Sequence, residues 1–256
     1  MRTAVTIAIV ISLASRSAIA DSDDIVTRPL TLARGQLEAR LTLELNLQLT
    51  QEGSPTSIAP DAWYGLTDRW TVGVTHSNAS LDRIDASASV CIVHLANVCD
   101  RYYRGGAMEA RWSWRTGALA VAPRGRLLLR DVDPVKPAFT LGALVRWTRG
   151  RFALASDPYI RIGIANTNLG NRTQLTIPLY ILVQPTCRWL VGLHLGWESD
   201  LAVARDGSHG PLGLIVQARA TEHLDVTLHG GFTSLVGVQN NIKQRAVMLS
   251  IGWRTN

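Results

Sequence analysis

Long apolar runs are absent from this 256-residue sequence once its first twenty residues are set aside. No later segment is therefore long enough to cross a membrane as a helix. Charged residues are also few, at 18%, whereas hydrophobic residues make up 46% of the chain. That composition is apolar for a soluble protein. The excess of apolar side chains must be covered either by a large core or by lipid.

Cysteine is scarce as well, with three residues. Cys91 and Cys99 bound an irregular stretch, CIVHLANVC, and an oxidising compartment favours a disulfide between them, with two free thiols as the alternative. Cys187 has no evident partner, so no role is predicted for it. His94 lies between the first two cysteines, but the trio lacks a fourth ligand and a familiar zinc spacing. The sequence therefore predicts no metal site, and it contains no nucleotide fingerprint that would indicate a cofactor.

The first twenty residues have the three parts of a secretory signal peptide. Arg2 supplies a positive charge, residues 4–14 are apolar, and residues 18–20 form an AIA cleavage site. The apolar run is too short for a membrane anchor. The expected division of the chain is a signal peptide at 1–20, an extended or disordered periplasmic lead-in at 21–34 and one domain at 35–256. Without the signal peptide the net charge falls from +6 to about +4, too weak to indicate a nucleic-acid partner.

Residues 35–50, GQLEARLTLELNLQLT, alternate between apolar and polar side chains. A period of two places the apolar residues on one face of a β-strand, whereas a helix would spread the leucines around its whole circumference. The pattern therefore overrides the helical propensity of leucine and predicts a strand. We expect it to be the first strand of the domain and to pair with the last one, at residues 245–253.

The same alternation continues to the end of the chain and predicts about twelve strands with no helix between them. Short turns are expected at 67–69, 116–117, 149–150, 185–188 and 221–223, and one uninterrupted strand at 152–164. Longer loops are expected at 51–56, 78–106, 131–136, 167–172, 198–210 and 233–244. This alternation of short and long connections is typical of an up-and-down antiparallel barrel. The predicted fold class is therefore all-β, as a single barrel.

Two features indicate that the apolar face of this barrel meets lipid. Tryptophans on that face gather near strand ends, as in the aromatic girdles of membrane barrels. These residues are Trp70, Trp114, Trp147, Trp189, Trp197 and Trp253. The opposite face carries charges and many glycines, which suit a crowded polar interior. A soluble barrel is the alternative, but it gives the tryptophans no shared location, so we predict a transmembrane barrel.

The chain resembles the outer-membrane β-barrel proteins of Gram-negative bacteria. The resemblance rests on the signal peptide, the barrel pattern, the hairpin turn YGLTDRW at residues 64–70 and the final strand AVMLSIGW. The turn is similar to one in uncharacterised barrels usually described as transporter-like. The resemblance implies an outer-membrane location, lipid as a partner and insertion by the barrel-assembly machinery. Such barrels commonly end on an aromatic residue, whereas Arg254, Thr255 and Asn256 follow Trp253 here.

Arginine dominates the predicted polar face, whose charged residues are candidates for lining the lumen. The set comprises Arg40, Glu44, Glu109, Arg111, Arg124, Arg126, Arg146, Asp157, Arg161 and Arg219. An interior with surplus positive charge favours anions. The sequence therefore predicts passive passage or binding of small, anionic solutes. The alternative is a filled interior in which the charges pair and nothing is conducted, which leaves a structural or surface-binding barrel. The oligomeric state is not predicted.

An enzymatic alternative rests on the segment GVTHSNAS at residues 73–80. It resembles part of the His-x-Ser-Asn motif of outer-membrane phospholipases and lipid A deacylases, in which a histidine activates a serine. His76 continues the apolar-face register, but Ser77 points to the opposite face and Ser80 lies beyond the strand end. We therefore predict that the barrel is not an enzyme, with a lipid acyl hydrolase centred on His76 as the alternative.

Overall fold

The computed structural model describes residues 24–47, 56–76, 90–93, 103, 105–204, 207–238, 242 and 245–255. The strands are β1 (Leu37–Asn46), β2 (Thr56–Gly65), β3 (Trp70–Thr75), β4 (Val90–Val93), β5 (Gly106–Trp112), β6 (Leu119–Val132), β7 (Val135–Arg149), β8 (Phe152–Ser156), β9 (Tyr159–Gly163), β10 (Gln174–Thr186), β11 (Trp189–Asp200), β12 (Ser208–Arg219), β13 (Leu224–Gly237) and β14 (Arg245–Arg254). Short 3-10 turns are η1 (Ile25–Thr27), η2 (Thr167–Leu169) and η3 (Leu201–Val203). Among the described residues, no helix is long and apolar enough to span a membrane.

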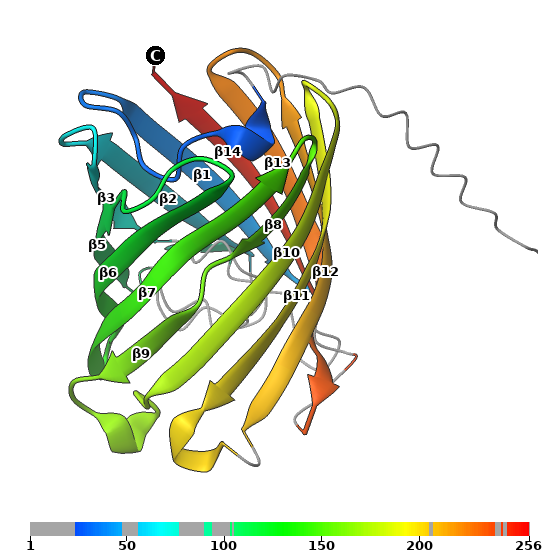
Figure 1. Cartoon of the computed structure of the whole chain (residues 1–256). Helices are drawn as coiled ribbons and strands as arrows, with labels where there is room; N and C mark the ends of the chain where they lie inside the picture. The colour runs from blue at the N-terminus through cyan, green and yellow to red at the C-terminus, as the bar shows by residue number, and fades with distance from the viewer. Residues whose placement is uncertain are drawn as a thin grey trace, which may run out of the picture.

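Twelve antiparallel strands close into one barrel (Figure 1). The first strand, β1, pairs with β2 on one side and with β14 on the other, so that Leu41 lies opposite both Pro60 and Ile251. β8 and β9 act as one interrupted strand, because both lie between β7 and β10. The predicted all-β barrel and its closure between the first and last strands are confirmed.

The strand expected over residues 152–164 is interrupted at Asp157 and Pro158, which separate β8 from β9. Proline has no N–H to donate to a neighbouring strand. The Pro158 carbonyl still accepts a hydrogen bond from Ala143 N at 3.1 Å, which keeps this point attached to β7. At the interruption the Asp157 carboxylate lies 2.6 Å from Arg124 on β6.

Several connections differ in detail from the prediction: β13 continues to Gly237 into the loop expected at 233–244, and β11 and β12 leave only 201–207 of the loop expected at 198–210. Residues 131–136 do not form a longer loop, because β6 runs to Val132 and β7 begins at Val135. The prediction was wrong because Pro134, after a cis peptide bond, occupies the turn itself, where proline is tolerated, and the strands continue on both sides. Within the connection expected at 78–106, β4 pairs with β2 and lies outside the ring of twelve.

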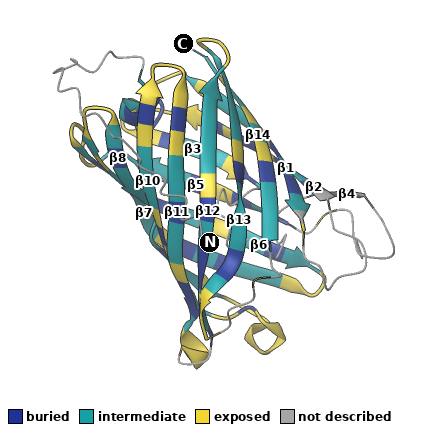
Figure 2. Ribbon diagram, turned by 90° about the vertical axis from the view of Figure 1, so that its right-hand side faces the viewer, coloured by how far each residue is buried: buried dark blue, intermediate teal, exposed yellow. Residues whose placement is uncertain are grey.

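Burial alternates along the strands and shows which face of the wall is outside (Figure 2). Met108 and Leu127 are 66% and 60% exposed, whereas their sequence neighbours Glu109 and Arg126 turn inward and pair there. The exposed fractions of the six tryptophans expected in the girdles lie between 39% and 65%. The apolar face is therefore the outer face, as in a barrel that is surrounded by lipid.

Residues 24–34, here called the N-terminal strap, lie in the mouth of the barrel at the rim with the short turns (Figure 1). The sequence predicted an extended or disordered lead-in for this part of the chain. Ile25 and Val26 are instead buried against Ala153 and Leu190 of the inner wall. Gly65 lets the strap pass close to β2, because a Cβ atom there would lie 1.8 Å from the carbonyl oxygen of Ala33.

Candidate functional site

A cluster of buried charges on the inner wall is centred on Glu109 of β5. The Glu109 side chain has no exposed surface, and its carboxylate contacts the guanidinium groups of Arg111 and Arg126, with Arg124 at 3.6 Å. The register of β5 and β6 places Glu109 opposite Arg126 and Arg111 opposite Arg124. Trp63 also donates a hydrogen bond from Nε1 to Glu109 Oε1 at 3.0 Å. A carboxylate buried this deeply requires such partners, because an isolated buried charge is strongly unfavourable.

Trp63 links this cluster to the inner face of β1. The centre of its ring lies 4.9 Å from Arg111 Cζ and 5.3 Å from Arg40 Cζ, within the range of cation–π attraction. Gly73 makes room for the ring, because a Cβ atom there would lie 2.3 Å from Trp63 Cδ1. One indole therefore contacts two guanidinium groups.

A second group of charges joins the first and last strands. Glu38 of β1 lies opposite Arg254 of β14, and its carboxylate contacts both Arg254 and Arg40, the latter at 2.8 Å. Charge pairing thus crosses the seam where the barrel closes. Arg254 belongs to the three residues that follow the last tryptophan, and here it has a role within the folded wall.

Positive charge exceeds negative charge in these two groups. Five arginines accompany three carboxylates. The arginines are Arg40, Arg111, Arg124, Arg126 and Arg254, and the carboxylates are Glu38, Glu109 and Asp157. The surplus matters for function, because paired charges alone would leave the interior electrically neutral.

The remaining residues expected to line the lumen have different surroundings. Glu44 is buried and accepts a hydrogen bond from Ser57 Oγ at 3.2 Å. Arg146 donates to the carbonyl oxygen of Arg28 in the strap. The Nε atoms of Arg161 and Arg219 are buried and have no hydrogen-bond partner among the described residues. The two guanidinium groups add positive charge to the inner wall, with Asp225 opposite Arg219 in the strand register.

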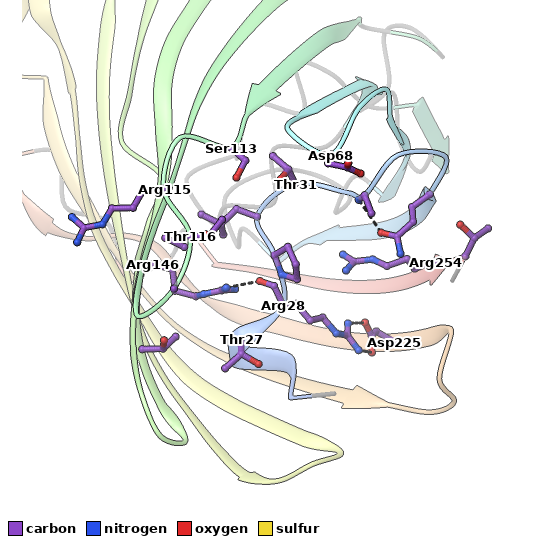
Figure 3. Close-up of a pocket in the computed structure, with 18 of the residues that line it drawn as sticks. Thr27, Arg28, Thr31, Asp68, Ser113, Arg115, Thr116, Arg146, Asp225 and Arg254 are labelled. Atoms are coloured by element: carbon purple, nitrogen blue, oxygen red, sulfur yellow. Dashed lines mark hydrogen bonds and ion pairs between the residues drawn. The ribbon is translucent and has the colours of Figure 1, made fainter. Parts of the chain in front are cut away.

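Described residues line two cavities on the inner side of the barrel. The larger, here called the vestibule, has a volume of about 860 Å³ and is lined by the strap and by Arg115, Arg146 and Arg219 (Figure 3). The smaller, here called the inner chamber, has a volume of about 240 Å³ and is enclosed by residues of β1, β8 and β10 to β14. Asp225 and Arg254 line both cavities. The vestibule and the inner chamber therefore meet at these two side chains.

Two histidines that the sequence left unassigned come together on the inner wall. The ring centroids of His194 and His229 are 5.1 Å apart, and His194 stacks on Tyr180 at 4.5 Å. The intervening strand β12 presents Gly213 opposite His194, which leaves space between the imidazoles. The sequence contained only a weak signal for this pair, because the rings are brought together by the register between strands and by the absence of a side chain at Gly213.

We expect His194→Phe to raise the free energy of unfolding by about 1–2 kcal/mol. Phenylalanine retains a ring on Tyr180 but removes two buried nitrogens that have no hydrogen-bond partner among the described residues. Urea titration in detergent micelles measures the change, with His223→Phe in the turn after β12 as the control. If His194→Phe unfolds at a lower urea concentration than the parent, the imidazole nitrogens form hydrogen bonds in the folded barrel.

His76, the centre of the enzymatic alternative, follows the end of β3 and has partners at both ring nitrogens. Nδ1 lies 2.6 Å from the carbonyl oxygen of Pro60, and Nε2 lies 3.3 Å from the hydroxyl of Tyr103. Ser77 and Ser80 lie outside the described residues. The structure therefore shows a tyrosine, and no described serine, beside this histidine.

Several other predictions concern residues that the structure does not describe. The signal peptide, Cys99 and the side chain of Cys91 fall outside the described part, so the disulfide stays a prediction. Cys187 is an exposed free thiol in the turn between β10 and β11. The described residues contain no group of three His, Cys, Asp or Glu side chains that could hold a metal ion.

The fold and the side chains together define a closed antiparallel β-barrel with an apolar outer face and a charged interior. Among solved structures, the chain is similar to the KdgM porin, with a TM-score of 0.55 and 7% identity over 86% of this chain and 99% of that one. It is also similar to the NanC porin, with a TM-score of 0.57 and 6% identity over 85% of this chain and 98% of that one. No family model and no curated protein matches the sequence. At these identities the likeness establishes the fold, and it confirms the predicted β-barrel, which this chain shares with these porins.

Proposed function

We propose that this barrel allows small solutes to pass the outer membrane passively, with a preference for anions. The observation that carries the proposal is the surplus of arginine over carboxylate on the inner wall. Fixed positive charge along a narrow, partly desolvated path raises the local concentration of anions and lowers that of cations. The porin fold supplies the path, and the arginines supply the selectivity.

The dimensions of the interior support a small solute. The inner chamber of about 240 Å³ is below the usual range of about 300–1,000 Å³ for sites that hold drug-sized ligands. Its wall combines Arg40 and Arg254 with the carboxylates Glu38 and Asp225 and with the rings of Tyr180 and His229, so a solute there meets both signs of charge and ring surfaces. The outer face contacts membrane lipid in this proposal, and insertion requires the barrel-assembly machinery.

The proposal assigns no catalytic role to the barrel. Among the described residues, His76 lies beside a backbone carbonyl and a tyrosine hydroxyl, whereas the acyl hydrolases need an activated serine. The non-conducting surface-binding barrel is the competing function.

We expect purified protein in a planar bilayer to give ionic currents. Under a potassium chloride gradient, their reversal potential should lie closer to the equilibrium potential of chloride than to that of potassium. The physical reason is the positive interior, which excludes potassium more than chloride. Recording at low and at high salt adds a check, because screening at about 1 M salt should weaken the preference. Absence of current would favour the non-conducting barrel, and a preference for potassium would contradict the anion proposal.

A further inference from the structure

The N-terminal strap has its first attachment on the inner wall at β10 and β11. Ile25 and Val26 pack against Ala153 and Leu190. Gln184 of β10 is fully buried and uses both ends of its amide on the strap. Its Oε1 accepts from Val26 N at 2.9 Å, and its Nε2 donates to Asp24 Oδ1 at 2.8 Å. A buried glutamine whose amide oxygen and nitrogen both form hydrogen bonds with one segment indicates a specific binding site for that segment.

The second attachment lies farther along the strap, where two other strands hold Arg28. The Arg28 guanidinium forms a two-pronged contact with the Asp225 carboxylate of β13, of which the Nη2–Oδ1 distance is 3.1 Å (Figure 3). Its backbone carbonyl accepts a hydrogen bond from Arg146 of β7. Paired hydrogen bonds between arginine and a carboxylate fix orientation as well as distance. The strap is therefore held in the middle of the mouth by side chains from both flanks.

The third attachment is on β2 and β3, on the far side of the ring from β10 and β11. Leu32 N donates to the buried Thr71 Oγ1 at 2.8 Å, and Gly35 N donates to the Gly65 carbonyl at 2.8 Å. From Val26 to Leu32 the strap thus crosses the mouth from one wall to the opposite wall.

We infer that the strap is a plug that occupies the mouth of the barrel, where it lines the vestibule, and that must move before a solute passes. The two cavities meet at Asp225 and Arg254, and the Arg28 contact occupies one of these side chains. The attachments are mostly polar, and the strap buries only three apolar side chains, Ile25 and Val26 at one end and Leu32 at the other. A segment held by hydrogen bonds and one partly exposed ion pair is released at smaller cost than a segment buried in an apolar core.

This inference rests on the proposed function for its effect on passage, but docking of the strap can be measured separately. The release variant is Arg28→Ala combined with Gln184→Ala, which removes the contact to Asp225 and both amide hydrogen bonds. Arg172→Ala is the matched control, because Arg172 forms an exposed ion pair with Asp200 at 3.2 Å at the end of the barrel with the longer loops. Single-channel recording and amide hydrogen exchange of the peptide over residues 24–34 are applied to all three proteins.

We expect slow exchange of the strap in the parent and the control, and fast exchange in the release variant. The ratio of open to closed states in the recordings should rise by about 30-fold in the release variant, as expected for loss of several net-favourable hydrogen bonds. Equal currents in parent and release variant would overturn the plug while leaving passage intact. Equally fast exchange in all three proteins would overturn docking of the strap. Loss of protection without current in any protein would contradict passage itself, and the gating role with it.

Discussion

Replacing Glu109 by glutamine is expected to lower the free energy of unfolding by about 3–5 kcal/mol. The amide has the shape of the carboxylate but no charge, so the guanidinium groups of Arg111, Arg124 and Arg126 are left together in the wall without their central partner. Asp157 compensates only one side of this group, through Arg124. Urea titration of the purified barrel in detergent micelles gives the midpoint and the slope from which the change is obtained.

The matched control for Glu109→Gln is Asp200→Asn, at an exposed ion pair with Arg172. An exposed pair contributes about 0–1 kcal/mol, so the control should unfold close to the parent. If Glu109→Gln and the control have the same free energy of unfolding, water in the lumen must solvate the arginines around position 109. The cluster would then carry charge for solutes without holding the wall together.

Replacing Arg161 and Arg219 by glutamate is expected to shift selectivity from chloride toward potassium. These side chains are suitable because their buried Nε atoms have no hydrogen-bond partner among the described residues, so the change breaks no described ion pair. A unit charge roughly 6 Å from a passing ion in water contributes about 0.7 kcal/mol, or about threefold in local concentration. Reversal potentials under a salt gradient report the resulting change in permeability ratio.

Two exposed arginines provide the comparison for this charge reversal. Arg149 and Arg188 are exposed at short turns, and their replacement by glutamate alters the net charge of the protein by the same amount. If the inner and the outer pair shift the reversal potential equally, selectivity arises from the overall field of the barrel. A shift confined to Arg161 and Arg219 places the selective charges inside.

The wall of the barrel was predictable from sequence because a strand needs only local information to choose its faces. Leu41, Leu43 and Leu45 share one face whatever their partners are, and the period of two is sufficient to show this. The closure of β1 on β14 followed from the same pattern at both ends of the chain. The interruption at Pro158 was not predicted, since proline also occurs in continuous edge strands.

The interior was predictable only in part. The alternation placed Glu109 and the neighbouring arginines on the polar face, but which charges meet depends on the register between strands. The strap was not predictable at all, because its sequence has no period and its partner Gln184 lies 158 positions from Val26. The position of Trp63 was also not predictable from sequence. Its ring lies inside the barrel, over Gly73, whereas the exposed tryptophans lie on the outer face near the rims.

The pairing of β1 with β14 sets an order on the assembly of the molecule. Leu41 and Ile251 are neighbours in the wall although almost the whole chain separates them, and contacts of such long range form late in folding. The strap directly precedes β1, and its seat on Ala153, Leu190 and Gln184 exists only once β8, β10 and β11 stand side by side. The strap can therefore dock only after those strands have paired, so that filling of the mouth follows assembly of this part of the wall.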